Sequence, residues 1–237
     1  MRTAYTYWAI PLTGILMVAL CHTASAEGKD AKPQKPPKGA MILFDGKDTS
    51  AWVHRGTGEP CAWTVADGAM EINIQKPDLL TKREFGDFRL HLEFNIPNMP
   101  DKRGQGRGNS GVYLQGRYEI QILDSYQNDT YPTGACGAIY GQKAPDINAA
   151  KPPGEWQTYD ITFRAARFDK DGKLLARPRV TVLWNGVKVH DDVEITLDVG
   201  VAGLEGKKSA TGPILLQNHG SKIKFRNIWL LPLESGK

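Results

Sequence analysis

An acid and an amide stand close together in the middle of the chain, Glu119 and Gln121, within residues 118–122. On a β-strand, alternate side chains point to the same face, so these two share one face while Ile120 and Ile122 share the other. A carboxyl group can take or give a proton during catalysis, and an amide can orient the hydroxyl groups of a ligand. The pair is therefore the first candidate for chemistry.

The element that must position this pair is a predicted hairpin over residues 109–124, with its turn at Gly116-Arg117. Apolar and polar side chains alternate along both of its strands, which predicts one face in the core and one polar face free to meet a ligand. The competing interpretation of Glu119 is a surface carboxylate paired with Arg117 or Arg89, a common arrangement on sheets.

Strand signals dominate the rest of the chain, and no segment has the caps and period of a helix. Alternating or apolar runs, bounded by Gly, Asn and Asp turns, cover residues 41–44, 63–74, 87–96, 156–164, 179–193 and 223–233. Asn185-Gly186 is the strongest hairpin signal. Many short strands without helical crossovers predict an all-β fold, an antiparallel β-sandwich or jelly roll. Residues 125–155 are predicted to form a long loop that is either functional or carries irregular structure of its own.

The first residues have the pattern of a signal peptide over 1–26, with an apolar run from Trp8 to Cys21 and Ala24-Ser25-Ala26 before the expected cleavage point. The run is shorter than the about 20 residues of a membrane span, so no transmembrane span is expected. A lipid anchor at Cys21 is the alternative. Export predicts a periplasmic or secreted protein. The Lys- and Pro-rich residues 27–40 predict a flexible linker, which leaves one domain over 41–235.

The formal net charge is +4, and several of the lysines behind it lie in the linker. The body is therefore close to neutral, and no basic face with interleaved aromatic residues is present, so no nucleic-acid partner is expected. The sequence makes no prediction about protein partners.

Two cysteines remain after the predicted cleavage, Cys61 and Cys136. They could pair in an oxidising compartment or stay as buried free thiols, and both alternatives are open. Two cysteines without clustered histidines give no zinc spacing. No cofactor is expected. Carboxylate and amide oxygens would suit a divalent cation such as calcium, and since no spaced loop signature is present, a metal site is left open without being assigned.

Two histidines are further candidates. His219 shares a strand face with Gln217, and imidazole titrates near neutral pH, which suits proton transfer, although a lone histidine is more often structural. His91 shares the polar face of its predicted strand with Arg89 and Glu93. These side chains join the site if that face lines a cleft, and are solvated charges if it does not.

Other candidates flank the hairpin or could stack on a ligand ring. Arg107 and Asn109 precede the first strand and Asp124 follows the second, although an aspartate there could equally cap a turn. Tyr113, Tyr140 and Trp52 are candidates for stacking on sugar rings, with core packing as the alternative, whereas Trp156 and Trp184 are expected in the core.

A set of short motifs, in order along the chain, resembles the 3-keto-disaccharide hydrolase domain family. The motifs are Phe44-Asp45-Gly46-Lys47 with Trp52, Asn109-Ser110-Gly111, Tyr118-Glu119-Ile120-Gln121-Ile122-Leu123-Asp124, Gly137-Ala138-Ile139-Tyr140, Glu155-Trp156-Gln157, Trp184-Asn185-Gly186, Leu216-Gln217-Asn218-His219-Gly220 and Phe225-Arg226-Asn227-Ile228. The resemblance covers residues 41–233. It implies a sandwich of the concanavalin A-like lectin/glucanase type, found in secreted bacterial proteins of carbohydrate use.

The resemblance also implies a reaction. A ketone at sugar carbon 3 acidifies the hydrogen on carbon 2, so a base can remove it while the group on carbon 1 leaves, and water then adds back. Such a route needs a base, a group that polarises the ketone and an acid for the leaving group. Glu119 and His219 are the expected catalytic residues on an oxidised glycoside, with direct hydrolysis left open. The alternative is a non-catalytic carbohydrate-binding module.

Overall fold

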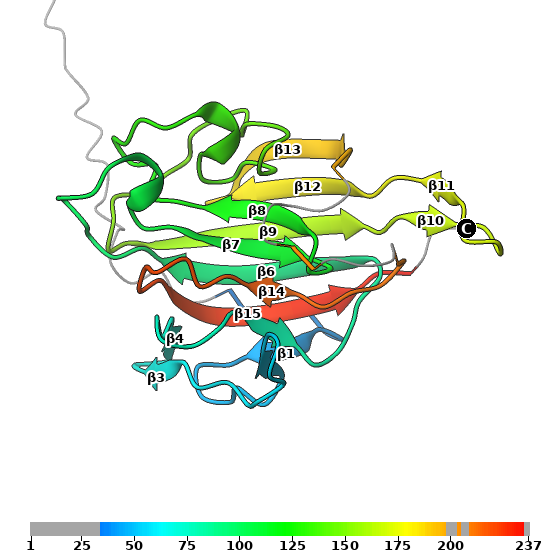
Figure 1. Ribbon diagram of the computed structural model, residues 1–237, viewed down its shortest axis with the longest axis horizontal. Helices are drawn as coiled ribbons and strands as arrows, with labels where there is room; N and C mark the ends of the chain where they lie inside the picture. The colour runs from blue at the N-terminus through cyan, green and yellow to red at the C-terminus, as the bar shows by residue number, and fades with distance from the viewer. Residues whose placement is uncertain (1–33, 198–202, 205–208, 235–237) are drawn as a thin grey trace, which may run out of the picture.

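The computed structural model describes residues 34–197, 203–204 and 209–234 (Figure 1). The predicted signal peptide and residues 27–33 of the predicted linker lie outside this part. The described chain forms β-strands and two short 3₁₀ helices, η1 (Gly104–Gly106) and η2 (Pro132–Gly134), with no α-helix among them. None of its helices is long and apolar enough to cross a membrane. The predicted all-β class is confirmed.

The larger of two main sheets is antiparallel and has eight strands. Its order is β13 (Val187–Glu194), β12 (Arg179–Trp184), β9 (Trp156–Arg164), β6 (Phe88–Asn95), β15 (Lys224–Pro232), β4 (Ala69–Glu71) and β3 (Thr64–Ala66), and β1 (Met41–Phe44) also pairs with β15. Asn185 and Gly186 form the turn between β12 and β13 with φ of 52° and 79°, as expected of a two-residue hairpin loop.

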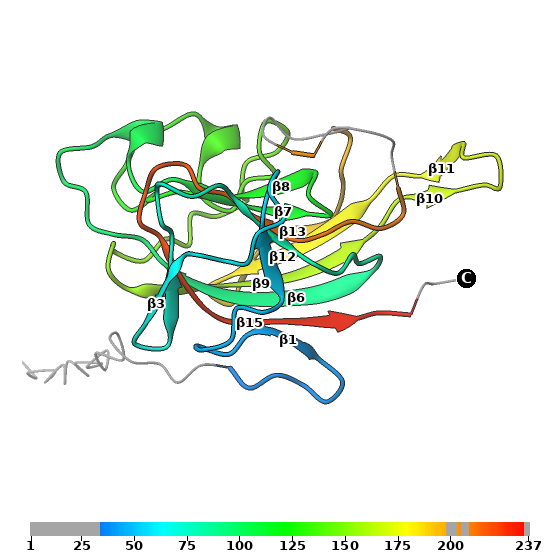
Figure 2. The same ribbon diagram turned by 60° about the horizontal axis from the view of Figure 1, so that its bottom comes forward.

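The smaller sheet has five strands and is packed over the first, so that the two form an antiparallel β-sandwich (Figure 2). Its order is β2 (Trp52–His54), β5 (Leu79–Thr81), β14 (Leu215–Leu216), β7 (Ser110–Leu114) and β8 (Tyr118–Ile122). A separate hairpin of β10 (Arg167–Phe168) and β11 (Leu174–Ala176) projects from one end (Figure 1).

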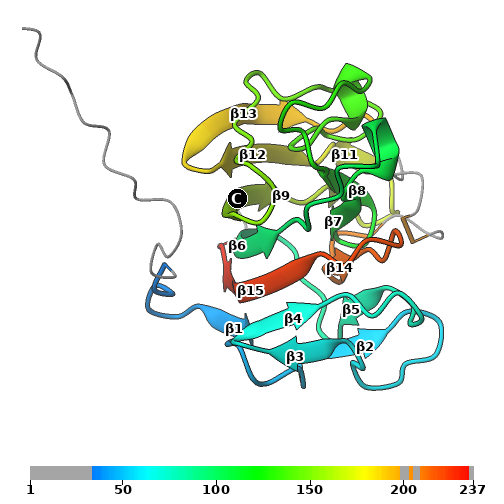
Figure 3. The ribbon, with the colours of Figure 1, turned by 90° about the vertical axis from the view of Figure 1, so that its left-hand side faces the viewer.

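The hydrophobic core lies between the two sheets, seen from the end of the sandwich in Figure 3. Leu92 and Phe94 of β6 and Ile120 and Ile122 of β8 are fully buried there, which confirms the predicted apolar faces of both strands. Burial of each such side chain contributes roughly 1.5–3 kcal/mol to stability. Since these isoleucines fill the core, the opposite face of β8 points away from it.

Trp52, Trp63 and Trp184 belong to the core as well. Trp184 is fully buried, as expected. Trp52 is fully buried too, and its Nε1 donates to the Leu43 carbonyl oxygen at 2.8 Å. Its predicted role as a sugar-stacking ring is therefore wrong. Trp156, expected in the core, is half-buried with the Arg226 guanidinium 4.0 Å from its ring centre.

The β7–β8 hairpin turns at Gln115 and Gly116, one residue earlier than predicted. Both have positive φ, 53° and 65°, and Arg117 N donates to Leu114 O at 3.0 Å. This is the primed turn whose twist suits a hairpin, and Gly116 adopts it without steric cost. The turn fixes a register that places Tyr113 directly opposite Glu119.

The middle of the polar face of β6 is neither a cleft wall nor solvated, since His91 and Glu93 are buried, whereas Arg89 of the same face is exposed. His91 is fully buried, its ring stacks on Trp229 and its Nδ1 lies 2.9 Å from Asp160 Oδ1. Glu93 accepts from Arg226 Nε at 2.7 Å. Burial would raise the pKa of Glu93, but hydrogen bonds from His91, Asn227 and Arg226 outweigh it and lower the pKa to about 2. His91, Glu93, Asp160 and Arg226 therefore stabilise one another within the larger sheet.

Cys61 and Cys136 are both free thiols, so they do not form the disulfide that was one alternative, and only Cys136 is fully buried. Cys136 is buried with its Sγ 3.1 Å from Tyr159 Oη, and burial raises the pKa of its thiol to about 12. Cys61 Sγ lies 3.7 Å from Met70 Sδ. A thiol with so high a pKa holds its proton at neutral pH and is not a nucleophile.

Candidate active site

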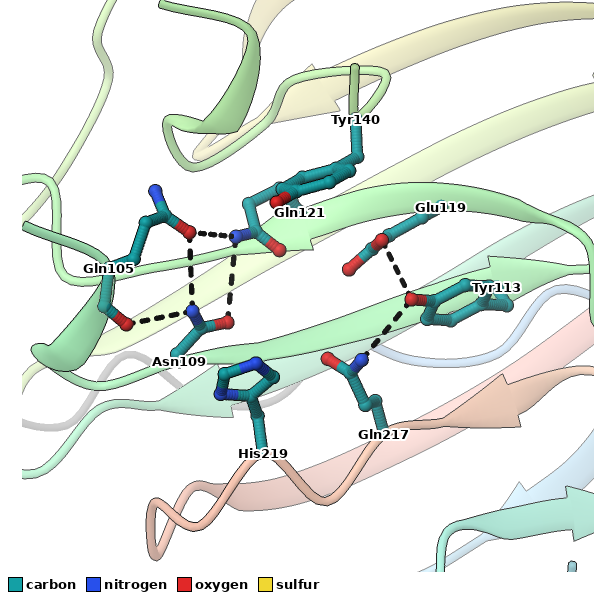
Figure 4. Close-up of a pocket in the computed structure, with 8 residues that line it drawn as sticks. All are labelled: Gln105, Asn109, Tyr113, Glu119, Gln121, Tyr140, Gln217 and His219. Atoms are coloured by element: carbon teal, nitrogen blue, oxygen red, sulfur yellow. Dashed lines mark hydrogen bonds between the residues drawn. The ribbon is translucent and has the colours of Figure 1, made fainter. Parts of the chain in front are cut away.

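A cavity of about 170 Å³ opens on the face of the smaller sheet that points away from the core (Figure 4). It is lined by Gln105, Asn109, Tyr113, Glu119, Gln121, Tyr140, Gln217 and His219. These side chains come from η1, from β7 and the residue before it, from β8, from the segment that follows β14, and from the long loop before β9. The structure thus brings together seven of the residues predicted from the sequence, and adds Gln105.

Glu119 lies deep in this cavity and is only 5% exposed. Its Oε2 accepts a hydrogen bond from the Tyr113 hydroxyl at 2.7 Å, and Gln217 Nε2 donates to the same hydroxyl at 3.2 Å. Burial raises the pKa of Glu119 to about 7, and the hydrogen bond from Tyr113 offsets only part of that rise. Neither arginine suggested as its surface partner lines the cavity. Glu119 can therefore exchange a proton near neutral pH.

The Gln121 side chain stands beside Glu119 and can serve either of its protonation states. In one orientation its amide nitrogen donates to Glu119 Oε1 at 3.0 Å and to Ser110 O at 2.9 Å, which suits an ionised carboxylate. In the other orientation the nitrogen faces Gln105 Oε1 at 3.2 Å and Asn109 Oδ1 at 3.5 Å, and the amide oxygen faces Glu119. That second orientation suits a protonated carboxyl group.

Tyr140 forms one wall of the cavity because its backbone extends the sheet beyond β8. Its N donates to Glu119 O at 3.1 Å, and Gln121 N donates to Ala138 O at 3.0 Å. A hydrogen bond with Tyr131, burial and the nearby Glu119 raise the pKa of Tyr140 to about 12. Tyr140 is therefore a neutral phenol beside the carboxyl group.

Gln105 was not predicted, and it organises the polar end of the cavity. Its Nε2 donates to Thr130 Oγ1 and to Gly134 O, both at 2.8 Å, and its backbone oxygen accepts from Asn109 Nδ2 at 2.8 Å. It sits in a Gly-rich loop with no periodic pattern. The one available signal was a polar loop leading directly into the hairpin.

His219 and Gln217 lie on the side of the cavity opposite Tyr140, below Asn109 and Tyr113 in Figure 4. Gln217 is anchored on β7, since its N donates to Gly111 O at 3.0 Å and its O accepts from Ser110 Oγ at 2.7 Å. His219 is exposed at the rim. Its imidazole therefore stands where a group that leaves the cavity would pass.

Three predicted site residues lie outside the cavity lining. Arg107 and Asp124 form an ion pair with each other, with Arg107 Nε 2.7 Å from Asp124 Oδ2, and so tie the loop before β7 to the end of β8. His91 belongs to the larger sheet, where it is enclosed by Trp229 and Asp160. All three support the fold in this structure and are not placed to touch a ligand in the cavity.

The lining is thus a ring of neutral hydrogen-bonding groups around one titratable acid, with a histidine at the rim. Among the described residues, those that line the cavity include no Lys or Arg. In the same part of the chain, no three His, Cys, Asp or Glu side chains cluster as a metal site would require. Amide and phenol groups of this kind suit a neutral polyhydroxylated ligand.

Comparisons with known proteins identify the family of this chain. Residues 39–231 match the model of the 3-keto-alpha-glucoside-1,2-lyase-like domain. A protein described as a "putative glycosyl hydrolase" from Parabacteroides distasonis is 37% identical, covers 98% of this chain and 100% of its own, and superposes with a TM-score of 0.78. No curated protein matches the chain.

Two further structures from the same organism, described in the same words, share the fold. One is 22% identical over 86% of this chain and all of its own, with a TM-score of 0.65. The other is 25% identical over 82% of this chain and 99% of its own, with a TM-score of 0.56. The family resemblance read from the sequence motifs is confirmed by the model match and the 37% identity. The chain therefore belongs to the family of 3-keto-alpha-glucoside-1,2-lyase-like domains.

Proposed function

We propose that the protein cleaves glycosides already oxidised at sugar carbon 3, by elimination and hydration. A base removes the hydrogen on carbon 2, the electron pair forms a double bond between carbons 2 and 1, and the bond from carbon 1 to the glycosidic oxygen breaks. The departing oxygen takes a proton. Water then adds back with its hydroxyl on carbon 1 and its hydrogen on carbon 2, so the net change is hydrolysis.

The observation that carries this proposal is Glu119, a buried carboxyl group whose pKa is raised to about 7 in a cavity of neutral side chains. A base is most effective when its pKa lies near the working pH, because it is then both available and strong. Because the ketone makes the hydrogen on carbon 2 acidic, a single carboxylate base is sufficient to remove it. The two opposed carboxylates of ordinary glycosidases are not required.

The other lining residues take supporting roles in this proposal. Asn109, Gln121 and Gln217 would orient the sugar hydroxyls and polarise the keto oxygen, since amides both donate and accept. His219 at the rim would protonate the departing oxygen. Tyr113 is a positioning residue, because it acts on the substrate through Glu119.

The direct test is to incubate the purified protein with 3-keto-glucosides and with the parent glucosides, and to follow release of the group on carbon 1. Release from the 3-keto forms alone supports the proposal. Calorimetric binding of the sugars without any product would instead favour a carbohydrate-binding module. A deep cavity around a carboxyl group with a raised pKa supports catalysis, because mere binding gains nothing from that burial cost.

Export is the second part of the proposal, and it depends on the sequence of residues 1–26 alone. We expect the mature chain in the periplasm or the medium of its host. Cell fractionation, with N-terminal sequencing of the recovered chain, checks this, and an intact N-terminus in the cytoplasmic fraction would refute it.

Replacing Tyr113 by Phe is expected to shift the acid limb of the pH profile of kcat/KM upward. The Tyr113 hydroxyl stabilises the ionised form of Glu119 and so offsets part of the rise in pKa that burial causes. Without this hydroxyl, the pKa of Glu119 is expected to rise above about 7. As the base, Glu119 must be ionised, so the variant needs a higher pH to reach half-maximal activity. An unchanged profile would show that another group titrates in the active form.

Replacing Gly111 by Ala is expected to reduce kcat by about a hundredfold or more. An added Cβ would lie 2.3 Å from Glu119 Oε1 and 2.9 Å from Tyr113 Cε2, so the carboxyl group must move. Displacement of a catalytic group by about 1 Å can cost a hundredfold in rate. Gly106→Ala is the matched control, since its added Cβ would meet no atom within 4 Å. Equal activity of the two variants would place the reacting carboxyl elsewhere.

A further inference from the structure

The cavity is too small to enclose a disaccharide. Its volume of about 170 Å³ lies below the roughly 300–1,000 Å³ of sites that enclose a drug-sized ligand, and so it fits a single sugar ring. Glu119 lies at its buried end, and the rim is formed by less buried residues. If the oxidised ring occupies the cavity, the group on its carbon 1 must lie at the mouth, where it can also depart.

Two tyrosines stand together on one side of that mouth. Tyr140 lines the cavity, and Tyr131 lies against it with ring centres 6.2 Å apart and planes at 72°. Their hydroxyl groups are hydrogen-bonded to each other. Tyr131 is 45% exposed, which leaves a large flat apolar surface in solvent next to the cavity. Figure 4 shows Tyr140 and His219 on opposite sides of the opening.

The exposed ring is held rigidly. Gly134 N donates to Tyr131 O and Gly141 N to Thr133 O, both at 3.0 Å, so the loop that carries Tyr131 is closed on itself. A Cβ at Gly134 would lie only 2.2 Å from Tyr131 Cε2, so the ring rests directly on bare backbone. A ring fixed before binding loses little conformational entropy on contact with a ligand.

We propose that Tyr131 and Tyr140 form a leaving-group subsite that stacks on the ring attached to carbon 1, a second sugar or an aryl group. The inference rests on the proposed function, because it assumes that the oxidised ring occupies the cavity. The flat face of an aromatic ring packs well on sugar C–H groups and on other rings, and rigid exposed tyrosines are frequent anchors of binding sites. A methyl leaving group is too small to reach Tyr131.

The kinetic test compares a 3-keto-disaccharide, a p-nitrophenyl 3-keto-glucoside and a methyl 3-keto-glucoside. Tyr131→Ala is expected to lower kcat/KM about tenfold for the two ring-bearing substrates and to leave the methyl substrate within about twofold. Tyr131→Leu, which keeps an apolar side chain without a flat face, should behave in the same way. Tyr131→Phe keeps the ring and should stay within about threefold of the wild type.

A loss for the disaccharide alone would identify the subsite as one for sugars, and a loss for the aryl substrate alone as one for aryl groups. Equal losses for all three substrates would make Tyr131 a residue that merely supports the fold, and no loss for any would place the leaving group elsewhere. Either of the last two results overturns the proposal.

A binding test separates this inference from the proposed reaction. Calorimetry with Glu119→Gln compares the affinities of the 3-keto-disaccharide and the methyl 3-keto-glucoside, with and without Tyr131→Ala. The disaccharide should bind about tenfold better only when Tyr131 is present. The calorimetric measurement needs no turnover, so it tests the subsite even if the wild-type protein cleaves none of the substrates. If the ratio of the two affinities is the same with and without Tyr131→Ala, the subsite is refuted.

Discussion

Glu119→Gln is expected to lower kcat/KM on a 3-keto-glucoside by a factor of roughly 10² to 10⁴, the usual contribution of a general base. The amide keeps the shape of the side chain and can still meet the Tyr113 hydroxyl, but it cannot accept the proton from carbon 2. Rates with single-turnover and steady-state assays, at several pH values above 7, provide the measurement. A variant with the wild-type rate would remove Glu119 from the mechanism.

The same variant should be more stable than the wild type at alkaline pH. Burial raises the pKa of Glu119 from 4.5 to about 7, so the folded protein holds this proton more tightly than the unfolded chain. The resulting stability is complete below about pH 4.5 and is lost as the pH rises through 7, at a cost of up to about 3 kcal/mol. The Glu119→Gln protein has no carboxylate to bury, so it is expected to be more stable than the wild type at pH 8 and nearly as stable as the wild type at pH 5.

Glu93→Gln is the matched control for this effect, because the pKa of Glu93 is lowered by folding whereas the pKa of Glu119 is raised. Hydrogen bonds hold the pKa of Glu93 at about 2, so its ionised form stabilises the protein above pH 4.5 and this contribution is lost as the pH falls toward 2. The control should therefore be destabilised at pH 8, where Glu119→Gln is stabilised. Urea midpoints at pH 5 and pH 8 measure both. A Glu119→Gln protein that is less stable than the wild type at pH 8 would contradict the raised pKa.

His219→Ala is expected to lose activity in proportion to how poorly the leaving group departs. Acid assistance is worth roughly a hundredfold for a sugar or alkyl oxygen, which leaves as a strong base, and little for p-nitrophenolate, which is already stable as an anion. We expect kcat to fall about a hundredfold on a 3-keto-disaccharide and less than about threefold on the p-nitrophenyl substrate.

The leaving-group comparison is its own control, because both substrates place the same oxidised ring in the same cavity. Equal losses on both would mean that His219 positions the sugar and does not protonate the leaving oxygen. Restoration of the slow reaction by added imidazole would support the proton-transfer role.

Much of the fold was predictable because alternation reports directly on burial. The apolar faces of β6 and β8 and the Asn185-Gly186 turn follow from side-chain period and turn chemistry, which are local properties. The short strands β2 and β5 were not predicted, and β14 ends at Leu216, before the Gln217 and His219 that were expected to share a strand face. Strands of two or three residues carry too little pattern, and they form only because neighbouring strands supply their hydrogen bonds.

The residues of the candidate site also fall into those that a regular strand pattern predicted and those that it did not. Glu119, Gln121 and Tyr113 were predicted because they occupy one face of a regular hairpin. Gln105 was missed because it lies in an irregular loop whose position depends on contacts with Thr130 and Gly134, far along the chain. Tertiary contacts of this kind leave no periodic signal in the sequence.

His91 and Asp124 show the limit of residue type as evidence. Both are titratable and near the predicted strands, yet each is buried against a partner on another element, Asp160 and Arg107 respectively. A polar side chain on a strand face can be solvated, functional or enclosed in an ion-pair network. Only the packing of the two sheets distinguishes these cases.

The measurement closest to the central claim is the fate of hydrogen at carbon 2 in D₂O. Elimination followed by hydration removes that hydrogen and returns one from solvent, so the 3-keto sugar released by the wild-type protein should carry deuterium at carbon 2. The product alone, incubated without protein, corrects for spontaneous exchange, and Glu119→Gln should slow both labelling and release together. A product released at the wild-type rate with unlabelled carbon 2 would show direct hydrolysis and would contradict the role proposed for Glu119.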